Sequence, residues 1–328
     1  MNKKITKLTI KNQLEIIPTK PFHFDSTFYK PGHFPSQDTK WEPGKRWQTM
    51  LWQGEKLGII YEDAGTKSKP KVRIKIFSDK KLTKKFLEEL QKETIWRFNL
   101  DLDLAGFYKY IKKDFLLKPI IKKFYGLRPM SYSSLYEYLI ISIVLQNTVV
   151  RRSINMLQSL FENYGSLVEY DKQKLWCYWE PKVLARTQEQ KLRDFKMGYR
   201  AKSFIRVSKS FANGEIDELV LRQKNPQEQE KSLISLYGIG PASVGYIMFD
   251  AFHRWDYMKN ISPWEQKIYT HIFFNKNHEK HLVSVSKMLK RFKKWGKWKG
   301  LAVNYVWEDI WWKRRNEHIP WLEKEIRM

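Results

Sequence analysis

The chain of 328 residues carries 61 Lys and Arg against 35 Asp and Glu, and its formal net charge of +26 favours a polyanionic partner. A single cysteine, Cys177, excludes a disulfide framework and any zinc or iron–sulfur centre held by several cysteines. The sequence contains no apolar run of membrane-spanning length and no hydrophobic leader, so we expect no membrane partner and a cytoplasmic, nucleoid-associated protein.

Short runs of alternating apolar and polar residues characterise the first eighty positions, as they do the strands of an antiparallel sheet. The runs expected to form strands are 5–10, 14–17, 22–29, 47–52, 57–61 and 72–77. From residue 82 onward the apolar spacing becomes helical, and we extend this interpretation through residues 166–230. The sequence therefore predicts an α+β fold, with a β-rich domain over residues 1–97 and an all-α domain over residues 98–328.

A strongly apolar helix is predicted to begin at the capping box formed by Ser134 and Glu137 and to run to Leu145. Amide, hydroxyl and cationic side chains follow its end. They are Gln146, Asn147, Thr148, Arg151 and Arg152. Such a group suits a contact with a DNA duplex beside its phosphates, whereas a helix cap with solvated charges explains it equally well.

Residues 235–244 predict two helices joined by a tight turn. Gly238 and Gly240 would supply unusual backbone angles, and Pro241 suits the first position of the second helix. The N–H groups at such a helix start lack intrahelical acceptors, so they form a site for a phosphate. An ordinary glycine-capped connection is the alternative for this motif alone. The N–H groups concerned belong to Gly240, Ala242 and Ser243.

Four segments, in this order, resemble motifs of the helix-hairpin-helix DNA glycosylase superfamily, in the branch of 3-methyladenine DNA glycosylase II and the 8-oxoguanine glycosylases. The segments are residues 126–129, 145–147, 198–202 and 236–242. A related branch holds an iron–sulfur cluster on four cysteines, which this chain lacks. The resemblance implies a β-rich N-terminal domain followed by a mainly α-helical, two-lobed glycosylase body with a helix-hairpin-helix motif.

The resemblance also implies a base-excision reaction, in which a damaged base is flipped out of duplex DNA and its N-glycosidic bond is hydrolysed. Asn147 aligns with the side chain that fills the gap left in the duplex, and Thr148 is the neighbouring candidate. The expected partner is double-stranded DNA containing a damaged base, bound by a monomer. Side chains expected to bind its backbone are Arg151, Arg152, Arg200 and Lys202.

An aspartate of this family stabilises the positive charge that develops on the sugar. Aligning Ile268 with an apolar position of the family places Glu265 there, with a side chain one methylene longer. Asp256, in the preceding loop, is the second candidate. A third interpretation is that the protein binds damaged or bent DNA without cleaving it.

Family members that also cleave the strand carry a lysine in the position of Ala242, so the resemblance implies a monofunctional hydrolase. Lys267 is the nearby lysine to be tested as an alternative nucleophile. Trp264 and Tyr269 are candidates for a pocket that stacks on a base, although aromatic residues at helical spacing more often pack in a core. An alkylated purine is the expected base, and an oxidised purine is the alternative.

No cofactor is expected to be required. Relatives hold a monovalent cation on backbone carbonyls of the hairpin, and the resemblance extends this possibility to the present chain. The carbonyl groups concerned belong to Ile234, Leu236 and Gly238.

Overall fold

The structure is a computed structural model that describes residues 4–29, 36–131 and 133–326. The chain divides into two compact units that interleave along the sequence. Unit 1 consists of Met1–Asp103, Tyr125–Lys224 and Ser235–Gly238, and unit 2 consists of Leu104–Phe124, Asn225–Ile234 and Ile239–Met328. Neither unit coincides with the stretches 1–97 and 98–328 that the sequence separates, because segments from the middle of the chain belong to both.

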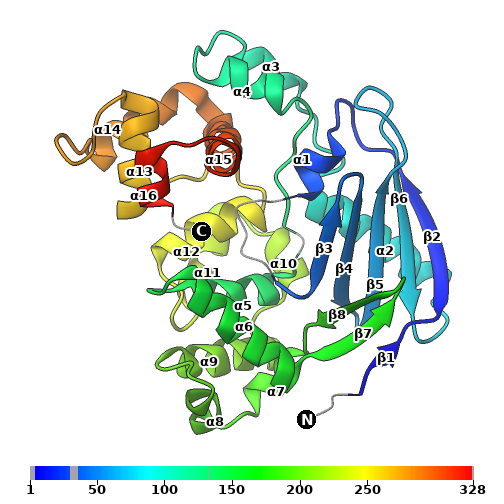
Figure 1. Cartoon of the computed structure of the whole chain (residues 1–328). Coiled ribbons are helices and arrows are strands. Elements are labelled where there is room, and N and C mark those ends of the chain that lie inside the picture. The colour runs from blue at the N-terminus through cyan, green and yellow to red at the C-terminus, as the bar shows by residue number, and fades with distance from the viewer. Residues whose placement is uncertain (1–3, 30–35, 132, 327–328) are drawn as a thin grey trace. The chain divides into compact units, whose positions relative to one another are not determined.

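Unit 1 contains a five-stranded antiparallel sheet (Figure 1). In spatial order its strands are β2 (Ile10–Ile16), β6 (Val72–Ser78), β5 (Glu55–Asp63), β4 (Lys45–Trp52) and β3 (Thr39–Glu42). The register pairs Leu14 with Ile74 and Ile74 with Tyr61. Val72, Ile74 and Ile76 alternate with less buried residues along β6, because successive side chains of a strand point to opposite faces. The predicted β-rich N-terminal region is confirmed.

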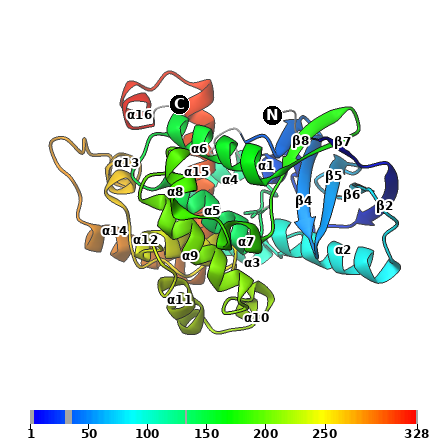
Figure 2. The same ribbon diagram turned by 90° about the horizontal axis from the view of Figure 1, so that it is seen from below.

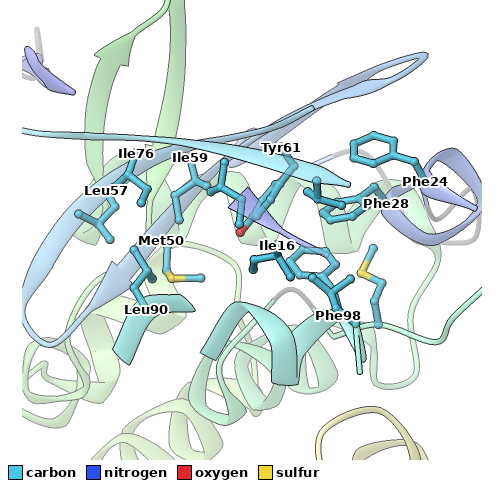
Figure 3. Close-up of a cluster of buried hydrophobic side chains, with 14 of the residues drawn as sticks. Ile16, Phe24, Phe28, Met50, Leu57, Ile59, Tyr61, Ile76, Leu90 and Phe98 are labelled. Carbon is cyan, nitrogen blue, oxygen red and sulfur yellow. The ribbon is translucent and has the colours of Figure 1, made fainter. Parts of the chain in front are cut away.

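The long helix α2 (Lys84–Phe98) runs along one face of this sheet (Figures 1 and 2). It begins where the Thr83 hydroxyl accepts a hydrogen bond from the Phe86 N–H (3.1 Å). Its buried residues Leu90 and Phe98 join a cluster of apolar side chains contributed by the strands (Figure 3). This cluster is a hydrophobic core to which both the sheet and α2 contribute.

A short helix, α1 (Phe24–Phe28), replaces the strand that the sequence predicts over residues 22–29. The helix begins at His23, whose ring accepts a hydrogen bond from the Ser26 N–H (3.3 Å). Phe24 and Phe28 lie one turn apart, and their stacked rings are 4.5 Å apart between centroids. Both rings therefore enter the core in Figure 3 from one helical face, whereas in a strand residues 24 and 28 would be more than twice as far apart along the chain axis.

A second sheet corrects the prediction of helical structure over residues 166–230. Strands β7 (Ser166–Tyr170) and β8 (Gln173–Cys177) form a hairpin, and β1 (Thr6–Lys7) pairs with β7 in parallel. The hairpin turns through Asp171 and Lys172, both of which have positive φ. Tyr170 packs over Gly58 of β5, where an added Cβ would lie 2.4 Å from the tyrosine ring. The small sheet therefore covers part of the five-stranded sheet. Its pairing of β1 with β7 joins Thr6 to Val168, which no local spacing in the sequence predicts.

The remaining helices of unit 1 include the largely buried helix α5. Ser134 and Glu137 form its predicted capping box, with the Glu137 carboxylate accepting from the Ser134 N–H (2.7 Å). These helices are α5 (Leu135–Leu145), α6 (Val150–Tyr164), α7 (Pro181–Ala185), α8 (Glu189–Asp194), α9 (Arg200–Ala212) and α10 (Glu218–Arg222).

Unit 2 is helical, and helix α15, with buried residues such as Leu301 and Tyr305 along it, supplies much of its core. Its elements are α3 (Ala105–Ile111), α4 (Leu117–Lys123), α11 (Pro226–Ile234), α12 (Pro241–Asp250), α13 (Pro263–Phe274), α14 (Val285–Phe292), the 3-10 helix η1 (Lys293–Trp298), α15 (Lys299–Asn316) and α16 (Pro320–Glu325). In the part of the chain that the structure describes, no helix combines the length and the apolar character needed to cross a membrane.

Candidate functional site

Two helices, α11 and α12, and the turn between them form the predicted helix-hairpin-helix. Gly238 has φ +82°, and an added Cβ would lie 2.5 Å from the Ser203 hydroxyl oxygen, so both backbone angle and space require glycine there. Gly240 has φ −102°, an angle open to any residue, and an added Cβ would meet nothing within 4 Å. The unusual backbone angle predicted for Gly240 is therefore absent, and its surroundings are open.

The start of α12 presents backbone donors at the surface. Pro241 is the first helical residue, and Val244 is the first whose N–H reaches back to a carbonyl of this helix start, that of Gly240 (3.1 Å). Ala242 is exposed and Ser243 is half-buried. Because the N–H groups of a first helical turn lack intrahelical acceptors, this end suits an anion.

Gln146, at the end of α5, connects three segments of unit 1. Its carbonyl accepts a hydrogen bond from the Arg200 guanidinium at the start of α9. Its side-chain amide donates to the Gly238 carbonyl (2.7 Å). Only 3% of Arg200 is exposed. Its guanidinium stabilises the turn after α5 and is not available at the surface for the predicted contact with DNA.

The turn after Gln146 places Asn147 at the surface. Asn147 adopts φ +44°, and its amide nitrogen lies 3.5 Å from the Tyr199 hydroxyl. Thr148 beside it is half-buried. Val149 is 70% exposed, an unusual state for an aliphatic side chain. Asn147 thus has the accessibility that gap filling needs, and Val149 is an apolar neighbour that the sequence analysis missed.

Cations flank this turn and the hairpin in unit 1. Arg151 and Arg152, on the first turn of α6, are exposed. Lys202 and Arg206, one turn apart on α9, both lie over the ring of Tyr237, at 5.3 and 4.3 Å from its centroid. Tyr237 is 41% exposed. Arg206 and Tyr237 were not among the predicted residues, although the i, i+4 spacing of Lys202 and Arg206 predicts that they share a helix face.

In unit 2, Glu265 lies at the start of α13 in a capping box with Ser262. Its Oε2 accepts from the Ser262 N–H (2.9 Å), and the Ser262 hydroxyl accepts from the Glu265 N–H (3.2 Å). Its Oε1 accepts from the Tyr269 hydroxyl (3.2 Å), which in turn accepts from the Trp307 indole N–H (2.8 Å). Only 8% of Glu265 is exposed. Both carboxylate oxygens are therefore held in fixed positions.

Aromatic side chains gather around this carboxylate. Trp264 is 38% exposed and stacks on the half-buried Trp307, with ring centroids 5.2 Å apart. The hydroxyl of Tyr246, on α12, interacts with the side chains of Glu265 and Ser262, while 45% of the residue is exposed. Tyr269 is 2% exposed and lies in the core. The surface suited to stacking thus consists of Tyr246, Trp264 and Trp307, of which the sequence analysis named only Trp264.

Burial and the charge of Glu265 raise the pKa of both nearby tyrosines. For Tyr269, burial is the larger cause, followed by the Glu265 carboxylate and then by Tyr246. For Tyr246, burial of the hydroxyl end again comes first and the Glu265 carboxylate second. Both hydroxyls therefore stay protonated at neutral pH and act as hydrogen-bond donors toward the carboxylate.

The other predicted residues of unit 2 lie in different surroundings. Asp256 is exposed in a turn after α12. Lys267 is 46% exposed at its side chain and pairs with Glu325, 3.7 Å away. Among residues 4–29, 36–131 and 133–326, no group of three or more His, Cys, Asp and Glu side chains suits a metal ion. Of the two carboxylates predicted for catalysis, Glu265 is thus the buried one, and Asp256 is exposed.

Known proteins that are similar to this chain include DNA glycosylases. No protein-family model matches the chain. A DNA-3-methyladenine glycosylase of Bacillus subtilis is 24% identical over 252 residues, which cover 73% of this chain and 82% of the relative. The structure of a 3-methyladenine DNA-glycosylase from Archaeoglobus fulgidus matches with a TM-score of 0.72 and 14% identity, covering 93% of this chain and 100% of that one. The apo-form of Clostridium acetobutylicum 8-oxoguanine glycosylase/lyase matches with a TM-score of 0.68 and 18% identity, covering 94% and 99%. The two structural likenesses show a shared fold.

Proposed function

Because the chain belongs to the helix-hairpin-helix DNA glycosylase superfamily, we propose that it is a DNA glycosylase that removes an alkylated purine from duplex DNA. The observation that carries the proposal is the environment of Glu265, a fixed carboxylate bordered by the partly exposed rings of Tyr246, Trp264 and Trp307. Alkylated purines are cationic, and a cation is attracted both to aromatic faces and to a carboxylate.

The chemistry that these side chains support is hydrolysis of the N-glycosidic bond. The C1′–N bond breaks, and its electron pair leaves with the base, whose positive charge is thereby neutralised. The sugar becomes an oxocarbenium ion, which the negative charge of Glu265 stabilises until water adds at C1′ and loses a proton. Hydrogen bonds from Ser262 and Tyr269 hold the carboxylate in place before the reaction, so that little reorganisation is needed.

Duplex binding is assigned to two groups of residues. In unit 1, Arg151, Arg152, Lys202 and Arg206 would neutralise phosphates, with Asn147 filling the gap left by the flipped nucleotide. In unit 2, the free N–H groups at the start of α12 would bind a phosphate. These contacts supply affinity and position, while the choice of base belongs to the aromatic surface of Tyr246, Trp264 and Trp307.

Strand cleavage is not part of the proposed activity. Ala242 has no nucleophile, and Lys267 has its ammonium group next to Glu325. A monovalent cation on the carbonyls of Ile234, Leu236 and Gly238 remains part of the proposal; the Gly238 oxygen accepts one hydrogen bond, from Gln146, and keeps a second lone pair. We propose a monomer.

A second candidate function, binding of damaged or bent DNA without catalysis, is favoured by one observation. Glu265 completes a capping box, and this structural role alone would explain its burial. Glu265→Gln separates the two functions, because glutamine also completes a capping box but carries no charge. The assay measures base release from duplexes containing alkylated bases or 8-oxoguanine, with alkali added afterwards to reveal abasic sites.

For a monofunctional glycosylase, wild type releases the alkylated base, strand breaks appear only after alkali, and the Glu265→Gln variant binds DNA without release. Strand breaks without alkali would contradict the monofunctional assignment. Release of 8-oxoguanine alone would replace the proposed substrate by an oxidised purine. Lesion-dependent binding without release by wild type would establish the binding function.

A further inference from the structure

Phe115, between α3 and α4 in unit 2, is 98% exposed. Full exposure of a phenylalanine forgoes the stabilisation that burial of its ring would give. Its neighbours Leu116 and Leu117 are half-buried and buried, so the chain turns only the aromatic ring toward solvent. A side chain in this state calls for an explanation beyond the fold of unit 2.

The backbone around Phe115 is fixed on one side by Asp114. Oδ1 of Asp114 accepts hydrogen bonds from the N–H groups of Leu116 (3.0 Å) and Leu117 (3.1 Å). The aspartate therefore closes the turn that begins α4, as Asp commonly does at such positions. Phe115 lies inside this closed turn, so its direction follows from the hydrogen bonds of its neighbours.

The other oxygen of Asp114 attaches the turn to η1. Oδ2 accepts from the indole N–H of Trp295 (2.9 Å) and pairs with the Lys294 ammonium group (2.6 Å). Tyr110 on α3 donates its hydroxyl proton to the Lys294 carbonyl (3.0 Å), and Trp295 is 2% exposed. The segment that carries Phe115 and the 3-10 helix η1, which are far apart in the sequence, are thus joined through Asp114 and the buried Trp295.

Positive charge is concentrated in these two segments. Residues 104–124 and 280–300 contain fourteen Lys and Arg but only one acidic residue, Asp114, whose carboxylate is already paired with Lys294. They account for half of the net charge of the chain. We name the exposed surface around Phe115 the basic tip; its members are Lys109, Tyr110, Lys112, Lys113, Phe115, Lys118, Lys293, Lys294 and Lys297.

We propose that the basic tip is a second duplex-DNA contact, in which Phe115 inserts at a base step from the minor groove while the surrounding lysines bind phosphates. The proposal rests on the proposed function in one respect, that duplex DNA is a partner of this protein. A single apolar ring among lysines has the composition of a minor-groove wedge. A membrane-binding surface would need a broader apolar face than one ring and the half-exposed Tyr110 provide.

A fluorescent label at position 115 tests directly whether duplex DNA contacts the basic tip. Cys177 is fully buried and burial raises the pKa of its thiol, so a Phe115→Cys variant has one reactive thiol, which is labelled with bimane. We expect the emission of the label to change when a short undamaged duplex is added and to follow the binding curve. A response to phosphatidylcholine vesicles containing phosphatidylserine, with none to the duplex, would overturn the proposal in favour of a membrane surface. No response to either would overturn it as well.

Affinity measurements give an independent test. Phe115→Ala should weaken binding of undamaged duplex about fivefold or more, the scale of one lost aromatic–base contact. Leu219→Ala, which removes a 53% exposed leucine from unit 1, is the control and should leave affinity unchanged. Equal affinities of the Phe115→Ala variant and wild type would contradict a wedge.

The lysines are tested through the salt dependence of binding. Replacing Lys112 and Lys113 by Gln should lower the slope of log affinity against log salt by about 2, because each phosphate contact contributes close to one. Replacing Lys84 and Lys85 on α2, both exposed, removes the same charge elsewhere. Equal effects of the two pairs would show that only net charge matters. None of these measurements depends on base release. The proposed DNA contact at the basic tip and the proposed glycosylase activity can therefore be refuted independently of each other.

Discussion

The hydroxyl of Tyr269 donates a hydrogen bond to Oε1 of Glu265 across one turn of α13, over 3.2 Å. Oε2 accepts from the Ser262 N–H, so Tyr269 and Ser262 hold different oxygens of the carboxylate. The tyrosine is itself held by the Trp307 indole (2.8 Å), which belongs to the aromatic surface of the proposed pocket. The buried hydroxyl of Tyr269 thereby links the position of the Glu265 carboxylate to that of the Trp307 ring.

Removing that hydroxyl should therefore slow catalysis without weakening DNA binding. A hydrogen bond to a charged group contributes about 1.5–3 kcal/mol, so Tyr269→Phe is expected to slow single-turnover base release about tenfold or more. Tyr305→Phe is the matched control, because this buried hydroxyl bonds to Tyr108 instead (2.9 Å). Equal release rates for the Tyr269→Phe variant and wild type would show that Glu265 does not depend on this donor.

Ser262 should affect both stability and activity, because its hydroxyl accepts from the Glu265 N–H and thereby fixes the helix start that carries Glu265. The Ser262 N–H, which alanine keeps, still donates to the carboxylate. Loss of a serine cap costs about 1 kcal/mol, so Ser262→Ala is expected to lower the free energy of unfolding by about that amount. Ser284→Ala removes a comparable cap from α14, where the hydroxyl accepts from the Lys287 N–H (3.4 Å). Urea unfolding should report similar losses for both variants, and base release should fall only for Ser262→Ala. Unchanged release in both would remove Ser262 from the proposed site.

The two glycines of the hairpin should respond oppositely to substitution. Gly238→Ala places a Cβ against the Ser203 hydroxyl at positive φ, and a cost of about 2 kcal/mol in the free energy of unfolding is expected. Gly240→Ala meets no atom within 4 Å and needs no special backbone angle, so it should change stability little. Urea unfolding of both variants is the measurement. Equal destabilisation would contradict the described geometry of the turn.

Glu137 should make stability depend on pH. Burial raises its pKa from 4.5 to about 7. The folded protein then binds this proton more tightly than the unfolded chain, so the contribution of Glu137 to stability falls as pH rises from 4.5 to 7, by up to about 3 kcal/mol. Glu137→Gln keeps an acceptor for the Ser134 N–H but does not titrate.

Urea unfolding at several pH values tests this expectation. The difference in unfolding free energy between the Glu137→Gln variant and wild type should shift in favour of the variant as the pH rises from 4.5 to 7. Glu162→Gln, at an exposed position of α6, should leave the pH dependence of wild type unchanged. Parallel curves for wild type and the Glu137→Gln variant would contradict the raised pKa.

Features that depend on neighbouring residues could be predicted from the sequence. The apolar helix α5 with its capping box, the helix pair around Gly238 and the alternating strands of the five-stranded sheet all rest on local spacing. Hairpin β7–β8 was missed, because its strands are stabilised by residues more than a hundred positions away, such as Gly58 beneath Tyr170.

The candidate site shows the same limit. Glu265 could be named from its place in a motif, but Tyr246 and Trp307 come from two other helices, and no spacing in the sequence indicates that they surround it. Trp264 and Tyr269 occupy the same helix, yet one is partly exposed and the other is buried. Which side of a helix faces solvent at a site depends on packing that a single amphipathic pattern does not determine.

The pairing of β1 with β7 has a consequence for synthesis of the chain. Thr6 lies beside Val168, so a strand made among the first residues waits for a partner made much later. At about 5–20 residues per second, the ribosome needs about 4–16 s to extend the nascent chain from the end of α2 to the end of β8. During this interval Trp47 and Ile60, which pack against the small sheet in the finished protein, lack their cover. A chaperone would therefore be expected to bind the N-terminal region of the nascent chain during this interval.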